Sequence, residues 1–182
     1  LNIPLVEVDF VKEYWNDVFV PFLSSYQSGQ ETPNPDVYCN RFIKFDAFLK
    51  YATKKLDVDF IATGHYARIS DNSGGSRQLL RGIDHTKDQT YFLSLVQSGS
   101  LEKVLFPIGN YLKSEIRDMV SEPLHGLSVL SKKESMGVCF IGKRNLKDFL
   151  GQYIDFTPGN FICADSGQVV GHHDGAEGYT IG

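Results

Sequence analysis

The chain has 182 residues, and its 18 lysines and arginines against 22 aspartates and glutamates give a formal net charge of −4. This charge excludes a strongly basic nucleic-acid clamp, although a local basic face stays possible. Hydrophobic residues make up 42% of the chain, which is typical of a globular protein. No apolar stretch is long enough for a membrane span, and three cysteines do not form a secreted disulfide framework.

The first predicted elements are a strand and a helix. Residues 3–10 are rich in branched apolar side chains, which predicts a strand near the centre of a sheet. Apolar residues then recur at steps of three and four from Val11 to Tyr26. This period predicts an amphipathic helix with a kink at Pro21.

A rigid loop and a second helix follow. The segment 31–36 has two prolines at alternate positions, so it fits neither helix nor strand. The apolar period over 42–56 predicts a helix with Asp36 or Asn40 as its N-cap. Residues 59–63 then predict a short buried strand that ends in a Gly-His-Tyr turn. The alternation of strands and helices predicts an α/β fold with a parallel sheet.

The rest of the chain alternates turns with short elements, and its tail is rich in β structure. In chain order the sequence predicts hairpin strands at 66–70 and 78–81, helices at 88–96, 98–104 and 113–120, extended segments at 127–130 and 137–141, a helix at 145–153, and strands at 160–164 and 168–171. We place a domain boundary at 142–145, so that one domain covers 1–143 and a small one covers 144–182.

Cys39 lies just after the double-proline loop, near the start of the predicted helix. Unpaired N–H groups and the helix dipole favour a thiolate there, so the pKa of this cysteine is expected to fall. Asp36 lies three residues earlier, where its carboxyl group could accept or donate a proton. The spacing alone slightly favours a simpler interpretation, a capping aspartate and a half-buried structural cysteine.

Cys139 is flanked by charged residues on both sides, among them Lys132, Lys143 and Arg144. A local excess of cations could stabilise a thiolate and could also bind phosphate. A buried cysteine in a strand is the alternative, and the spacing alone slightly favours it. Cys163 has no neighbouring charge, so we interpret it as a core residue.

Lys87, Asp88 and Gln89 follow a Gly-bearing turn and offer a cation, an acceptor and an amide. Such a cluster suits phosphate and base-edge contacts, and a helix cap with solvated neighbours has the same pattern. His65 follows Gly64 at the end of a predicted strand, where α/β folds place ligands, and fits a structural histidine equally well. The other histidines lack a cysteine or carboxylate at ligand spacing, so no metal site is assigned.

Six ordered motifs together resemble the tRNA-specific 2-thiouridylases, a family of ATP-dependent sulfurtransferases that thiolate the wobble uridine of certain tRNAs. The similarity runs from about Val6 to the last residue, and its motifs are TPNPDVYCNRFIKF, DFIATGHYAR, LLRGIDHTKDQTYFL, LFPIGNYLKSEIR, KKESMGVCFIGKRN and PGNF. The resemblance implies a parallel-sheet adenine-nucleotide alpha-hydrolase-like (PP-loop) domain, incomplete at its N-terminus, followed by a small β-rich central domain.

The resemblance also implies a mechanism with tRNA as substrate. ATP, expected with Mg²⁺, adenylates the uridine O2, and a persulfide on Cys139 delivers sulfur with help from Cys39, leaving a disulfide. Asp36 matches the family's acid/base position. An upstream sulfur-relay or desulfurase protein is the implied partner that loads the persulfide. The other implied positions are Gly64 for ATP and Asn34, Pro35, Asp36, His65, Lys87, Asp88 and Gln89 for tRNA.

The sequence departs from the family pattern at both ends. It contains no SGGxDS-type pyrophosphate loop and no C-terminal β-barrel, so we expect a fragment that binds ATP poorly and is inactive by itself. Alternative interpretations are a non-catalytic tRNA-binding or regulatory product and another persulfide-using, ATP-dependent sulfurtransferase. Two segments, VEVDFVKEYWNDVF and KKESMGVCFIGKRN, resemble the mitochondrial branch of the family. They predict a mitochondrial protein, with a cytoplasmic one as the alternative if the chain is bacterial.

Overall fold

The structure is a computed structural model that describes residues 3–28, 33–70, 76–121, 142 and 144–179. The chain divides into two compact units. The first comprises Leu1–Tyr14 and Asp36–Glu134, and the second comprises Trp15–Pro35 and Ser135–Gly182. The extended segments predicted at 127–130 and 137–141 lie outside the described residues, and Cys139 lies there with them.

Residues 3–10 form an irregular, exposed segment instead of the predicted strand. Leu5 is 94% exposed and Ile3 is 72% exposed, so these apolar side chains pack against little. The prediction was wrong because a central strand needs hydrogen-bonded neighbours, and no described strand pairs with this segment. At its end the Asp9 carboxylate accepts a hydrogen bond of 2.7 Å from the Val11 backbone N–H, where a helix begins.

The predicted first helix is present as three successive helical elements. In the first unit lies α1 (Val11–Tyr14), and in the second lie the π-helical turn η1 (Trp15–Phe19) and α2 (Val20–Ser28). Pro21 has no backbone N–H to bond the carbonyl of Asp17. The irregularity predicted at this proline therefore takes the form of a widened turn that precedes it.

The second unit has an aromatic core between η1 and the short helix α7 (Leu146–Leu150). The Phe19 ring lies 6.0 Å from the ring of Phe149 and 4.9 Å from that of Tyr153, centroid to centroid. The Asn145 side-chain oxygen accepts backbone hydrogen bonds from the first turn of α7 and so caps it. The helix predicted at 145–153 is thus confirmed in its first half.

A hairpin and a short helical turn form the last described part of the second unit. Its strands β5 (Gly159–Ile162) and β6 (Val169–His173) pair antiparallel, with an irregularity after Phe161, and the 3₁₀ turn η4 (Ala176–Gly178) follows. The β-rich texture predicted for this region is confirmed.

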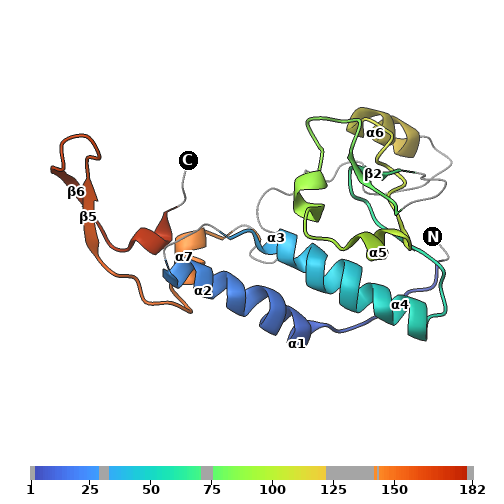
Figure 1. Ribbon diagram of the computed structural model, residues 1–182, viewed down its shortest axis with the longest axis horizontal. Helices are drawn as coiled ribbons and strands as arrows, with labels where there is room; N and C mark the ends of the chain where they lie inside the picture. Colours follow the sequence, from blue (N-terminus) through green and yellow to red (C-terminus); the bar gives the residue numbers. More distant parts are fainter. Residues whose placement is uncertain (1–2, 29–32, 71–75, 122–141, 143, 180–182) are drawn as a thin grey trace. The chain divides into compact units, whose positions relative to one another are not determined.

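In the first unit the second predicted helix is longer than its apolar period. It consists of α3 (Pro35–Tyr38), the π-helical η2 (Cys39–Phe48) and α4 (Leu49–Lys55), which form one continuous ribbon in Figure 1. Neither Asp36 nor Asn40 is the N-cap, because the helix begins at Pro35, before both. Proline suits this first position, since its fixed φ is helical and its missing N–H is not needed there.

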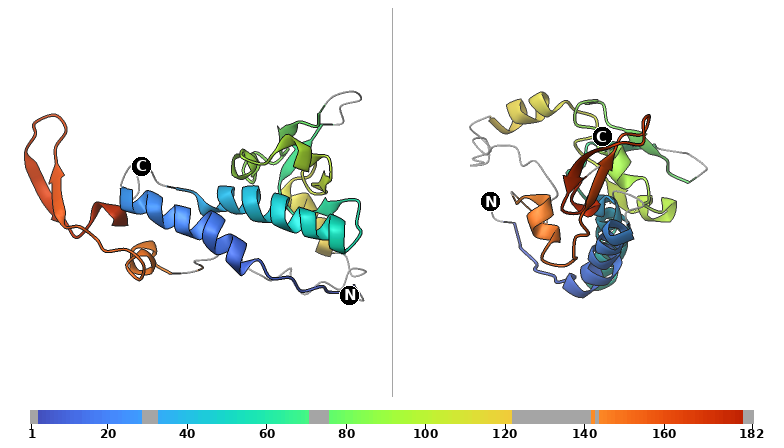
Figure 2. Two further views of the ribbon diagram at one scale, coloured as in Figure 1. Left: turned by 60° about the horizontal axis from the view of Figure 1, so that its bottom comes forward. Right: turned by 90° about the vertical axis from the view of Figure 1, so that its left-hand side faces the viewer.

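Two small sheets accompany this helix. The strands β1 (Ile61–Ala62) and β4 (Val104–Leu105) pair in parallel, and β2 (Ala67–Ile69) and β3 (Leu79–Arg81) form an antiparallel hairpin. The parallel pair and the hairpin confirm the predicted α/β arrangement. Figures 1 and 2 show the helix along one side of the strands, and the core between them consists of Phe45, Leu49, Ala52, Ile61, Ala67, Leu93, Val104 and Phe106.

Three short helices complete the first unit. The helix predicted at 88–96 is only the 3₁₀ turn η3 (Thr90–Leu93), and α5 (Ser98–Leu101) ends early because Val104 joins the parallel sheet. The helix predicted at 113–120 is confirmed as α6 (Lys113–Ser121).

Candidate functional site

Cys39 is the fifth residue of its helix and is buried, with 9% of its surface exposed. Burial raises the pKa of its thiol; Lys44 acts against this rise, and the negative charge of Asp36 adds to it. The expected lowering of this pKa by the helix N-terminus is therefore wrong. The free N–H groups belong to the first turn, which starts four residues before the cysteine. A protonated thiol at this position needs a base before it can attack.

Asp36 lies one helical turn before Cys39, three residues away, which places both side chains on the same face of the helix. Its effect on the pKa of Cys39 shows that the carboxyl group and the thiol interact electrostatically. Asn34 and Pro35 belong to the second unit; Asn34 directly precedes α3, and Pro35 is the first residue of this helix. The structure thus brings Asp36 and Cys39 together, whereas Cys139 lies outside the described residues.

Gly64 and His65 follow the carboxyl end of β1. Gly64 is exposed, and a Cβ built on it would have no atom of the described residues within 4 Å, so a ligand has room to approach the backbone. His65 is buried: its Nδ1 lies 2.8 Å from the Thr63 hydroxyl, and its ring packs against those of Phe45 and Phe106, at 5.6 and 5.8 Å between centroids. Burial, with help from Lys44, lowers the pKa of His65 to about 4. A neutral ring suits stacking or hydrogen bonding better than pairing with a phosphate.

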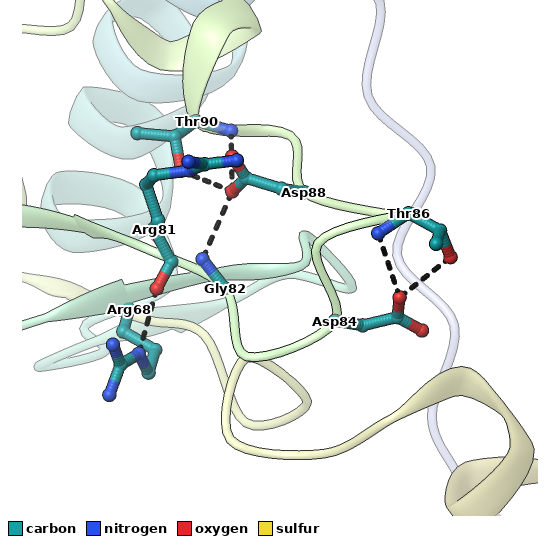
Figure 3. A network of polar contacts seen from close by, with 7 residues as sticks. All are labelled: Arg68, Arg81, Gly82, Asp84, Thr86, Asp88 and Thr90. Atoms are coloured by element: carbon teal, nitrogen blue, oxygen red, sulfur yellow. Dashed lines mark hydrogen bonds and ion pairs between the residues drawn. The ribbon is translucent and has the colours of Figure 1, made fainter.

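The loop that carries Lys87, Asp88 and Gln89 is held by two aspartates, shown in Figure 3. The Asp88 carboxylate accepts hydrogen bonds from the Gly82 backbone N–H and the Arg81 Nε, both at 3.0 Å, and from both donors of Thr90. Partial burial alone would raise the pKa of Asp88, but these hydrogen bonds outweigh it and lower the pKa to about 2. Asp88 therefore stays ionised and fastens the loop to the hairpin.

Asp84, which the sequence analysis missed, holds the other end of the loop. Its carboxylate accepts hydrogen bonds from the Lys113 backbone N–H at 2.9 Å and from the Thr86 N–H and hydroxyl at 3.0 and 2.7 Å. These bonds, led by that from Lys113, lower the pKa of Asp84. The sequence did contain a signal, since an Asp-x-Thr spacing occurs twice, at Asp84 and at Asp88.

Gln89 also has hydrogen-bond partners within the first unit. Its side-chain oxygen accepts a hydrogen bond of 3.0 Å from the Tyr66 N–H, and its own N–H donates to the Tyr66 carbonyl at 3.0 Å. Asp88 and Gln89 therefore have structural partners next to Lys87. Their contact with tRNA stays a prediction, and the geometry gives them a clear role in shaping the loop.

The Asp88→Asn variant is expected to be less stable than the wild type at pH 5, by an amount that shrinks as the pH falls. The folded-state pKa of about 2 lies below the ordinary value of 3.8, so this stabilisation is present above about pH 4 and is lost as the pH falls through 2. Urea unfolding of both proteins at pH 5, 4 and 3 measures the difference. Asp155→Asn, at an exposed position, is the control, and a difference that stays constant with pH would contradict the prediction.

Two further properties follow from the described ranges alone. Within them, no group of three or more histidine, cysteine, aspartate or glutamate side chains is arranged to hold a metal ion. No helix there is long and apolar enough to cross a membrane.

Comparisons with known proteins identify two matching family models. Residues 1–143 match the "tRNA methyl transferase HUP domain" and residues 147–182 match the "tRNA methyl transferase PRC-barrel domain". These matches confirm the predicted fold class, a PP-loop-like α/β domain followed by a small β-rich domain.

Among the relatives of this chain are bacterial proteins named "tRNA-specific 2-thiouridylase MnmA". Those of Ureaplasma parvum serovar 3, Lactiplantibacillus plantarum and Streptococcus agalactiae are each 50% identical to this chain over all of its 182 residues. The match covers 46%, 47% and 48% of these relatives, so the chain spans about half of their length. The mitochondrial assignment is wrong, because these relatives are bacterial and favour the cytoplasmic alternative. With the match over residues 1–143, the chain belongs to the tRNA methyl transferase HUP-domain family, which it shares with the tRNA-specific 2-thiouridylases.

Proposed function

We propose that this chain supplies the cysteines of a tRNA 2-thiouridylase, an enzyme that replaces the C2 oxygen of a wobble uridine with sulfur. The observation that carries the proposal is the 50% identity over all 182 residues to proteins named for this activity. The pair of Asp36 and Cys39 on one helix face supports it, because sulfur transfer needs a thiol with a nearby base.

The proposed sulfur transfer uses both cysteines. The terminal sulfur of a persulfide on Cys139 attacks C2 of the uridine, and the C2 oxygen, which ATP would first adenylate with release of pyrophosphate, leaves as AMP. The Cys39 thiolate then attacks the Cys139 sulfur, so the sulfur–sulfur bond of the persulfide breaks, a Cys39–Cys139 disulfide forms and the transferred sulfur stays on the base. Asp36 accepts the proton that the buried Cys39 thiol must lose first. A thiol reductant and a sulfur-relay or desulfurase partner restore the persulfide for the next cycle.

ATP, with Mg²⁺, would make the C2 oxygen a better leaving group. The exposed backbone of Gly64 fits such a ligand, because no side chain in the described ranges covers it and it lies at the carboxyl end of a parallel strand. In this proposal Gly64 lets the nucleotide approach closely. The PP-loop type of fold supports the use of ATP.

Binding of tRNA is proposed for the loop of Lys87, Asp88 and Gln89 and for the entrance to α3. The Lys87 side chain supplies a cation for a phosphate, while Asp88 and Gln89 fix the loop that presents it. The net charge of −4 is compatible with this, since one basic face is enough to position an RNA. Asn34, Pro35, Asp36 and His65 are the other proposed contacts, and the catalytic domain is proposed to end at residue 143.

Nucleoside mass spectrometry of tRNA tests the proposed function. Deletion of the gene that encodes this chain should remove 2-thiouridine, and a plasmid copy of the gene should restore it. Unchanged 2-thiouridine in the deletion strain would contradict the proposal and leave a non-catalytic tRNA-binding product as the better interpretation. Methylated nucleosides from the same digest are the internal control for tRNA quality and recovery.

A further inference from the structure

One buried side chain joins the helix of Cys39 to the loop of Lys87. Asn40 directly follows Cys39 and is 1% exposed. Its side-chain NH₂ group donates a hydrogen bond of 2.8 Å to the carbonyl oxygen of Phe92, which lies 52 residues further along the chain in η3. The bond therefore links two segments that are distant in sequence.

Packing alone does not explain an asparagine at this position. A buried amide loses its hydration, and it regains that free energy only through hydrogen bonds. Among the described residues the Asn40 side-chain oxygen has no partner, so only the NH₂ half of the amide is satisfied. Leucine has the same branching and the same number of side-chain heavy atoms, without an oxygen that needs a partner. An unfavourable polar group in a core is typical of a residue retained for function.

The bond from Asn40 reaches an element that is continuous with the Lys87 loop. η3 begins at Thr90, whose N–H and hydroxyl both donate to Asp88. Gln89 is held to the backbone of Tyr66 by two hydrogen bonds. The loop therefore cannot move as a rigid piece without breaking the bond to Asn40, and the position of Lys87 is tied to that of Cys39.

We propose that Asn40 is a positioning residue for sulfur transfer, which sets the distance between the RNA held by the Lys87 loop and the thiol of Cys39. The inference rests on the proposed function and adds a residue to it. Displacement of a reacting group by about 1 Å can lower a rate about 100-fold. Loss of the Asn40 bond is accordingly expected to slow the chemical step about 10- to 100-fold, through geometry rather than through loss of a substrate contact.

A double-mutant cycle on the full-length gene product tests this proposal. Single-turnover thiolation of a tRNA transcript is measured for the wild type, Asn40→Leu, Lys87→Ala and the double variant. If Asn40 couples the two sites, Lys87→Ala slows the wild type about tenfold but slows Asn40→Leu less than about threefold. Equal effects in both backgrounds would overturn the proposal, because a merely structural asparagine leaves the Lys87 effect unchanged.

Two further variants keep the result clear. Thr53→Val is the matched control, since the Thr53 hydroxyl bonds only to carbonyls of its own helix among the contacts described, and its cycle with Lys87→Ala should be additive. Asn40→Ala, which also removes the donor, replaces Asn40→Leu if circular dichroism shows that the leucine variant does not fold. A wild-type protein that forms no 2-thiouridine would refute the proposed function, and the Asn40 proposal with it, whereas an active wild type with an additive cycle refutes only the latter.

Discussion

The Cys39→Ser protein is expected to transfer sulfur to tRNA at least about 1,000-fold more slowly than the wild type, the usual scale for loss of a nucleophile. The serine hydroxyl has nearly the same size as the thiol, but it cannot attack a persulfide to release its terminal sulfur. Burial already raises the pKa of the thiol, so catalysis depends on deprotonation next to Asp36. The measurement is the single-turnover rate of 2-thiouridine formation on a tRNA transcript, with Cys139→Ser as the companion variant.

The third cysteine gives a matched control for this experiment. Cys163 lies after β5 in the second unit and is only partly buried, so its interpretation as a core residue was wrong; its N–H and carbonyl bond to Gln168 and Gly167. Cys163→Ser should therefore keep its rate within about twofold of the wild type. Equal losses in all three serine variants would indicate a general effect on folding, and full activity of Cys39→Ser would refute its role in the transfer. Trapped Cys39–Cys139 disulfide, detected by mass spectrometry of the wild type, would support the proposed sequence of bonds.

The sequence predicted those elements whose local pattern and tertiary surroundings agree. The apolar periods of the two long helices, the two strands of the β2–β3 hairpin and the run at 59–63 each have a packing or pairing partner, and each element exists. Residues 3–10 have the composition of a strand but no described partner, and they remain irregular. Composition thus indicates where a strand can form, whereas pairing decides whether it does.

The roles of the site residues stay predictions, whereas the electrostatics predicted for one of them was wrong. Cys39 and Asp36 do lie on one helix, yet the direction of the Cys39 pKa shift was wrong, because moving the helix start back to Pro35 places the thiol beyond the free N–H groups. Asn40 was considered only as a cap. Its bond to Phe92 spans 52 residues, and no local pattern encodes such a contact.

The stability of the protein is expected to fall by about 3 kcal/mol between pH 7 and pH 4 because of His65 alone. Its pKa is about 4 in the folded state, against an ordinary value of 6.5, since the ring is buried against Phe45 and Phe106. Between these two values the unfolded chain binds a proton that the folded protein does not. The contribution is therefore complete above pH 6.5 and is lost as the pH falls toward 4.

Urea unfolding at pH 7, 5.5 and 4.5 measures this dependence for the wild type and for His65→Gln, which has no proton to bind in this range. The variant should show a much flatter profile, whereas His85→Gln, at an exposed position, should follow the wild type. Parallel profiles for wild type and His65→Gln would show that the ring is not held neutral by its surroundings.

The wild type and His65→Gln also test how this histidine contacts RNA. A neutral ring releases no counterion from a phosphate, so His65→Gln should leave the salt dependence of tRNA binding unchanged, while Lys87→Ala should lower its slope by about one.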